Sequence, residues 1–125
     1  MNHAKKIVIV EDEEIICADL SRTLQKFGYQ VAGTASSGPE AIQIASTAQP
    51  DLVLMDVRLQ GSMDGIEAAR NIRKHSNVPI LFVTAHAGAR ALNLSELPGK
   101  FGSIAKPFSP AQLRETIESI LHSPG

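Results

Sequence analysis

The sequence has little cysteine, no long apolar run near its start and almost no net charge. Its one cysteine, Cys17, excludes an internal disulfide and fits a reducing compartment. The first residues lead into an apolar stretch too short for a signal-peptide core or a membrane span, so we expect a cytoplasmic protein. The formal net charge is −1 and the Lys and Arg residues are scattered, which argues against direct binding to nucleic acid or to an anionic membrane.

Length and apolar content indicate one folded unit. The chain has 125 residues, of which 43% are hydrophobic, enough to bury a core without a disulfide. A second folded domain would have no room. We therefore predict a single domain over residues 1–125, with its core at about residues 5–122.

The hydrophobic pattern alternates between short continuous runs and helical spacing. The runs at 7–10 and 52–55 are typical of strands buried on both faces. Gly28 is a plausible helix stop, and Ser37 with Pro39 is a plausible helix start. We expect strands at 6–10, 29–35, 52–55, 80–83 and 103–105, and helices at 14–27, 37–49, 64–74, 87–99 (interrupted by Pro98 and Gly99) and 109–121.

This order predicts an α/β fold with a doubly wound, five-stranded parallel sheet and helices on both faces. Ligands of such sheets bind at the carboxyl ends of the strands. Polar residues follow the expected strands at that edge: Glu11 and Asp12 after the first, Asp56 after the third, Thr84 after the fourth and Lys106 after the fifth. The spacing therefore predicts one site built from separated segments.

These residue types suit metal-assisted phosphoryl transfer. Asp12 and Asp56 can supply the oxygen ligands that Mg²⁺, or Mn²⁺, prefers. An aspartate carboxylate is also a competent nucleophile when positioned donors and a cation offset the charge on the incoming group. Lys106 and Thr84 suit that supporting role.

At this point the sequence resembles the response-regulator receiver family of two-component signalling, whose fold is a flavodoxin-like (βα)5 domain. The resemblance covers almost the whole chain. It is carried by Ile-Val-Glu-Asp-Glu at 9–13, Leu-Val-Leu-Met-Asp at 52–56, Phe-Val-Thr-Ala at 82–85 and Ala-Lys-Pro-Phe at 105–108.

The resemblance implies a role for each matched residue. Asp56 would be the phosphoacceptor, and Glu11 and Asp12 would hold Mg²⁺ together with Asp56. Thr84 would bind a phosphoryl oxygen and Lys106 would pair with the acyl phosphate. The resemblance also implies a cis peptide bond before Pro107, and a histidine kinase or histidine phosphotransfer protein as the phosphodonor.

Further positions follow from the resemblance or depart from it. The backbone carbonyl of Arg58 would be another metal ligand, and the side chains of Arg58 and His86 would tune the lifetime of the phosphoryl group. Receivers usually carry an aromatic residue three positions before the lysine, where this chain has Ser103, with Phe101 two positions earlier. The chain therefore lacks the usual aromatic partner of Thr84 at position 103. The loop at 58–65 looks one residue longer than its commonest version.

We predict a signalling switch that is a phosphoacceptor and not an enzyme, and whose surface at 87–99, 103–105 and 109–121 changes on phosphorylation. A stand-alone receiver is the leading version, and a receiver excised from a larger regulator or hybrid kinase is the alternative. A phosphate-independent interaction module stays open because of Ser103. The downstream partner is not identified, and a homodimer formed on phosphorylation is one possible readout. An apolar cluster of Leu92, Leu94 and Leu97 could face either the sheet or a partner.

Overall fold

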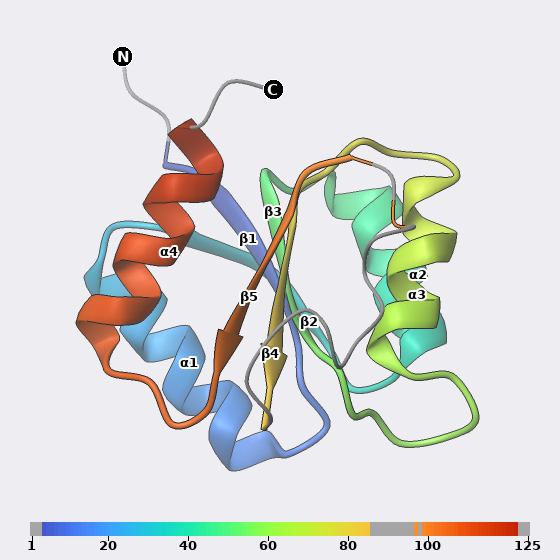
Figure 1. The fold of residues 1–125 in the computed structure, drawn as a ribbon, viewed down its shortest axis with the longest axis horizontal. Coiled ribbons are helices and arrows are strands. Elements are labelled where there is room, and N and C mark those ends of the chain that lie inside the picture. The colour runs from blue at the N-terminus through green and yellow to red at the C-terminus, as the bar shows by residue number, and fades with distance from the viewer. Residues whose placement is uncertain (1–3, 86–96, 98, 123–125) are drawn as a thin grey trace.

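The computed structural model describes residues 4–85, 97 and 99–122, and its centre is a parallel sheet. The strands are β1 (Lys6–Val10), β2 (Gln30–Ala35), β3 (Leu52–Asp56), β4 (Ile80–Thr84) and β5 (Phe101–Ala105). They form a five-stranded sheet in the order β2-β1-β3-β4-β5, with every neighbouring pair parallel (Figure 1). This is the strand order of flavodoxin-like doubly wound sheets, the fold that the resemblance implies.

Helices cover both faces of the sheet. They are α1 (Glu14–Lys26), α2 (Gly38–Ala48), α3 (Gly65–Arg73) and α4 (Pro110–His122). Helices α1 and α4 lie on one face and α2 and α3 on the other (Figure 1). Within the described ranges, no helix is long and apolar enough to cross a membrane.

Alternation along the buried strands divides the core into two clusters. Val8, Val53 and Phe82 pack toward α2 and α3. Ile9 and Leu54, their neighbours in sequence, pack toward α1 and α4. The middle strands are buried on both faces because successive side chains of a strand point to opposite sides, and this explains their continuous apolar runs.

Local contacts confirm the predicted starts of α2 and α3 and the predicted stop after α1. The Ser37 hydroxyl accepts a hydrogen bond from the Glu40 backbone N–H (3.4 Å), and Pro39 occupies the first turn of α2. The Asp64 side chain caps α3 by accepting from the Glu67 N–H (2.8 Å). Gly28, just after α1, has a φ of +93°, a conformation that glycine adopts without a steric penalty.

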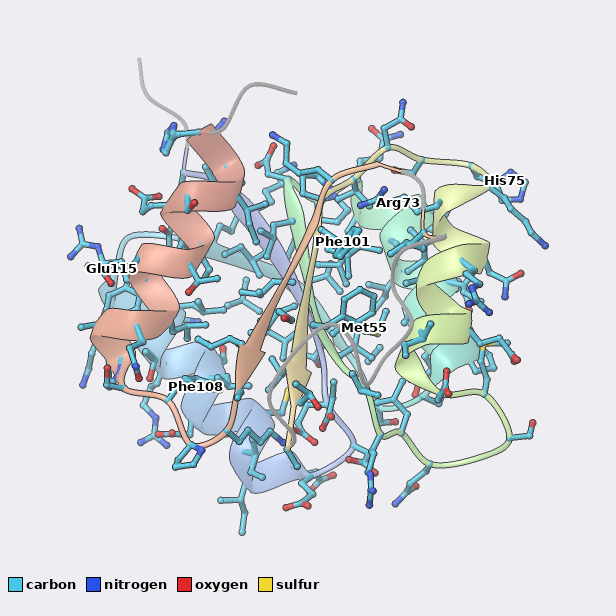
Figure 2. All side chains as sticks on the ribbon, viewed as in Figure 1. Met55, Arg73, His75, Phe101, Phe108 and Glu115 are labelled. Atoms are coloured by element: carbon cyan, nitrogen blue, oxygen red, sulfur yellow. The ribbon has the colours of Figure 1, made fainter. Side chains whose placement is uncertain are left out.

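The segment before Lys106 differs from expectation, since β5 begins at Phe101 rather than at Ser103. Phe101 is in register with Ile80 and packs on the core toward α2 and α3 (Figure 2), so pairing with β4 extends the strand. Leu97 is buried in the same cluster, which resolves its role as core. The expected helix at 87–99, with Leu92 and Leu94, falls largely outside the described residues.

At the amino ends of the strands, hydrogen bonds of two basic side chains join α3, β5 and α4. The Arg73 Nε donates to the Val78 carbonyl (2.9 Å), and its guanidinium also donates to the Lys100 carbonyl. The Lys100 ammonium donates to the Ile120 carbonyl in the last turn of α4 (3.1 Å). This end of the sheet is therefore held by contacts independent of the opposite, acidic edge.

Candidate functional site

Three carboxylates meet at the carboxyl edge of the sheet. Glu11 directly follows β1 and is only 5% exposed, Asp12 is half-buried, and Asp56 ends β3 and is 8% exposed. One ligand atom from each lies within 4.8 Å of the others. Strands β1 and β3 are hydrogen-bonded neighbours, so their ends bring together residues separated by more than a third of the chain.

The Lys106 ammonium group lies against this cluster. The Lys106 Nζ is 3.5 Å from Asp56 Oδ2 and 3.6 Å from Glu11 Oε1. The Lys106 backbone N–H donates to the Thr84 carbonyl (2.8 Å), which fastens the segment after β5 to the end of β4. The peptide bond from Lys106 to Pro107 is cis, as the resemblance implied.

The pKa of the Glu11 carboxyl is strongly displaced. Burial is the main cause, and proximity to Asp12 and Asp56 adds to it, so the pKa of Glu11 rises from 4.5 to about 7. A hydrogen bond from the Glu13 N–H to Glu11 Oε2 (3.0 Å) acts in the opposite direction. The Lys106 ammonium also favours the charged form, but at 3.6 Å and half-exposed it does not outweigh burial.

The Asp56 carboxylate is oriented from two sides. Its Oδ1 accepts a hydrogen bond from the Arg58 backbone N–H (3.1 Å), and its Oδ2 faces Lys106. The Val57 N–H donates to the Val83 carbonyl (3.1 Å), which holds the chain leaving β3 against β4. The Arg58 side chain is exposed, so the contact with Asp56 is made by its backbone.

The remaining predicted residues are placed on β4, on β5 or beyond them. Thr84 ends β4, is buried, and is in register with Ala105. Ser103 is half-buried and in register with Phe82, whereas Phe101 is in register with Ile80 at the opposite end of β4 from Thr84. His86 lies outside the described residues.

The acidic cluster has the chemistry of a site for a hard divalent cation. Glu11, Asp12 and Asp56 offer only oxygen donors, and oxygen donors are the ligands that Mg²⁺ takes in proteins. Carboxylates held this close also repel one another, and a cation between them would relieve that repulsion. The donor set therefore fits a magnesium-type ion.

Sequence reasoning missed two features of this edge. Ile15, in the first turn of α1, is a large apolar residue whose side chain is exposed to solvent, with 85% relative accessibility. Gly65 is buried, and a Cβ at this position would overlap the Asp56 carbonyl oxygen. Neither feature has a clear sequence signal, because Ile15 reads as one more apolar residue of the helix and Gly65 as a turn residue.

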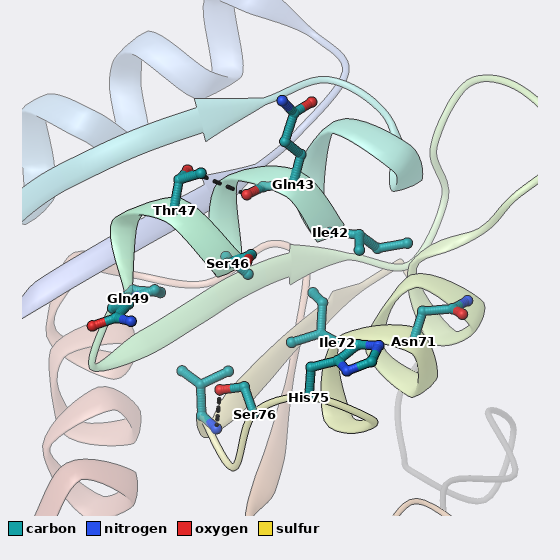
Figure 3. A pocket seen from close by; sticks show the side chains of 12 residues that line it. Ile42, Gln43, Ser46, Thr47, Gln49, Asn71, Ile72, His75 and Ser76 are labelled. Atoms are coloured by element: carbon teal, nitrogen blue, oxygen red, sulfur yellow. Dashed lines mark hydrogen bonds between the residues drawn. The ribbon is translucent and has the colours of Figure 1, made fainter.

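A groove lies at the opposite edge of the sheet from the acidic cluster. It has a volume of about 560 Å³ and lies between the C-terminal ends of α2 and α3 (Figure 3). Its lining includes Ile42, Ser46, Asn71, Ile72 and His75, and none of the predicted site residues. The groove is therefore separate from the acidic cluster.

The sequence matches a family model described as the response regulator receiver domain over residues 7–118. It is 36% identical over 114 residues to the transcriptional regulatory protein PdtaR of Mycobacterium tuberculosis, covering 91% of this chain and 55% of that protein. It is 37% identical over 119 residues to the phyllosphere-induced regulator PhyR of Methylorubrum extorquens, covering 94% of this chain and 44% of that protein. The chain thus spans about half the length of these curated relatives.

Solved structures show the same likeness. The receiver domain of the sensor histidine kinase PA1611 from Pseudomonas aeruginosa has a TM-score of 0.84 and 30% identity, covering 97% of this chain and 100% of that one. That structure is described with a magnesium ion coordinated in its active site cleft. The acidic cluster of the present chain offers oxygen donors, which are the ligands that Mg²⁺ prefers.

Proposed function

Since the chain belongs to the response-regulator receiver family, we propose that it accepts a phosphoryl group on Asp56 in a Mg²⁺-dependent reaction and thereby signals to a partner. The donor is a phosphohistidine on a histidine kinase or histidine phosphotransfer protein. In this proposal the chain is both the substrate of a kinase and a conformational switch, rather than an enzyme that acts on a separate substrate.

The placement of Asp56 supports this proposal most strongly. It is a nearly buried carboxylate whose Oδ1 is held by the Arg58 N–H (3.1 Å) and whose Oδ2 lies 3.5 Å from the Lys106 Nζ. Glu11 and Asp12 complete an acidic cluster beside it. A nucleophile oriented in this way and flanked by a cation is what phosphoryl transfer requires.

In the proposed reaction a carboxylate oxygen of Asp56 attacks the phosphorus of the phosphohistidine. The P–N bond breaks, its electron pair returns to the imidazole nitrogen, which takes up a proton, and an aspartyl phosphate forms on Asp56. Lys106, whose ammonium lies beside Asp56, would pair with the phosphoryl oxygens. Thr84 ends the neighbouring strand at the same edge and would bind one of these oxygens. Arg58, through its backbone, keeps the carboxylate in position.

Glu11, Asp12 and Asp56 would hold the Mg²⁺, together with the backbone carbonyl of Arg58. The ion would supply charge compensation for the phosphoryl oxygens as the bond to Asp56 forms. We further propose that the side chains of Arg58 and His86 set the lifetime of the aspartyl phosphate. Because position 103 is a serine, β5 has no aromatic side chain beside Thr84. The conformational response to phosphorylation would therefore not use the usual coupling between Thr84 and an aromatic residue at this position.

The direct test is intact-mass analysis after incubation with acetyl phosphate and Mg²⁺. Wild type should gain one phosphoryl group, Asp56→Ala should gain none, and omission of Mg²⁺ should prevent the gain. Asp19→Asn, which changes an exposed aspartate on α1, is the matched control and should label like wild type. Equal labelling of wild type and Asp56→Ala would refute the acceptor assignment. No labelling of either would favour a phosphate-independent interaction module.

The exposed side chain of Ile15 supports a contact with a protein phosphodonor. It lies one turn beyond Asp12 at the start of α1 and leaves a large apolar group in water beside the site, where a docking partner would cover it. Ile15→Ala should slow transfer from a phosphorylated histidine phosphotransfer protein while leaving labelling by acetyl phosphate unchanged. Gln25→Ala, an exposed change near the far end of α1, is the control. Equal slowing with both donors would contradict a docking role.

A further inference from the structure

The loop that follows Asp56 is fastened to the start of α2. Gln60 in this loop forms an isolated parallel bridge with Ser37, the N-cap residue of α2. Leu59 and Met63, from the same loop, pack on the core cluster beneath α2 and α3. Two segments distant in sequence therefore act as one packed unit beside the acidic site.

The Met63 side chain packs directly against Gly38, which brings the loop after Asp56 into close contact with the start of α2. Gly38 is buried at the first position of α2, and a Cβ there would lie 2.6 Å from the Met63 Sδ and 2.7 Å from its Cγ. Ordinary carbon contacts need about 3.5 Å or more, so only glycine lets the Met63 side chain rest on the helix start. Gly33, which also lies beside α2, makes no such contact with the loop, because its nearest neighbour is Ile44.

The loop is closed at its other end by backbone contacts around the acceptor. The Gly65 N–H donates to the Val57 carbonyl (2.8 Å), and the Arg58 N–H donates to Asp56 Oδ1 (3.1 Å). Gly61, at φ +93°, supplies the turn between the two ends. The loop is thus held at α2 on one side and at the acceptor on the other.

From this geometry we infer that Met63, resting on Gly38, is a positioning residue for the Arg58 backbone. Its packing holds the Arg58 N–H on the Asp56 carboxylate and holds the Arg58 carbonyl at the acidic edge. The part concerning the carbonyl rests on the proposed function, whereas the part concerning the N–H stands on the contacts of the metal-free chain. The start of α2 is then a support for the site although it contributes no ligand.

The first test is amide hydrogen exchange of the metal-free protein. Met63→Ala removes the side chain that seats the loop, so the Arg58 N–H should exchange about tenfold faster, while the Val57 N–H, bonded to β4, should not. Gly38→Ala should have the same effect by displacing Met63. Met63→Leu, which keeps an apolar side chain of similar volume, should behave like wild type. Unchanged protection of Arg58 in both disruptive variants would overturn the inference.

The second test is Mg²⁺ affinity by titration of the folded variants. Met63→Ala and Gly38→Ala should bind Mg²⁺ about tenfold more weakly, the cost typical of removing a residue that orients a ligand. Gly33→Ala is the matched control, since it also crowds α2 (3.3 Å to Ile44 Cδ1) but not the loop, and should keep wild-type affinity. Equal weakening in Gly33→Ala would overturn the positioning role in favour of general destabilisation. A wild type that binds no Mg²⁺ would refute the proposed function, and the exchange result would still decide the positioning of the Arg58 N–H.

Discussion

Replacing Glu11 by Gln should stabilise the metal-free protein near pH 8. Glu11 is 5% exposed and its pKa is raised from 4.5 to about 7, mainly by burial and further by Asp12 and Asp56. Ionising a group with such a displaced pKa costs the folded state about 3 kcal/mol at a pH well above 7. Lys106, 3.6 Å away, loses part of its pairing in the variant, so we expect a net gain of about 2 kcal/mol.

The sign of the pH dependence follows from proton linkage. Below about pH 4.5 Glu11 is protonated in both the folded and the unfolded chain, so wild type and Glu11→Gln should differ little. Between about pH 4.5 and pH 7 the unfolded chain releases the proton while the folded chain keeps it, and wild type loses stability relative to the variant as the pH rises. Above about pH 7 the difference should level off.

The assay is urea unfolding of both proteins in EDTA at several pH values, followed by circular dichroism. Glu14→Gln, an exposed change in the first turn of α1, controls for the loss of one negative charge. A difference between wild type and Glu11→Gln that stays flat from pH 5 to pH 8 would refute a displaced pKa for this carboxyl. Saturating Mg²⁺ should reverse the order of stability, because ion binding favours the folded wild type.

Three further changes test other parts of the structure. Tyr29 is the one tyrosine and the chain has no tryptophan, so tyrosinate absorbance reports it alone. Burial and its hydrogen bond to Glu118 (2.7 Å) raise the pKa of Tyr29, so Glu118→Gln should lower the titration midpoint. A wild-type midpoint equal to that of free tyrosine would contradict the contact. Gly65→Ala forces a Cβ onto the Asp56 carbonyl oxygen and should lower the free energy of unfolding, measured with urea, by about 2 kcal/mol. A variant as stable as wild type would show that the close approach is absent. Arg73→Met leaves the Val78 and Lys100 carbonyls without their guanidinium donor and should lower the free energy of unfolding by about 2 kcal/mol in the same assay. Arg70→Met, at an exposed site, is the control, and equal effects of the two changes would contradict the role of Arg73.

Much of the fold was predictable because strands and helices have local signatures. The run at 52–55 is continuous and apolar, and it is a strand buried on both faces at Leu52–Asp56. The helix expected at 64–74 is found at Gly65–Arg73. The start of β5 was not predictable, because Gly102 and Ser103 are weak strand formers and only pairing of Phe101 with Ile80 extends the strand.

Some features of the candidate site were likewise predictable from the sequence, and others were not. The order of residues along the chain specifies which polar residues follow the strands, and in a parallel sheet those residues must gather at one edge. It could not determine that three carboxylate ligand atoms lie within 4.8 Å, that Glu11 is buried, or that Met63 rests on Gly38. Periodicity and capping act over a few residues, whereas these distances depend on strand order, register and the packing of segments far apart in the chain. Long-range packing sets these distances, and with them the pKa of Glu11 and the packing of the loop against α2.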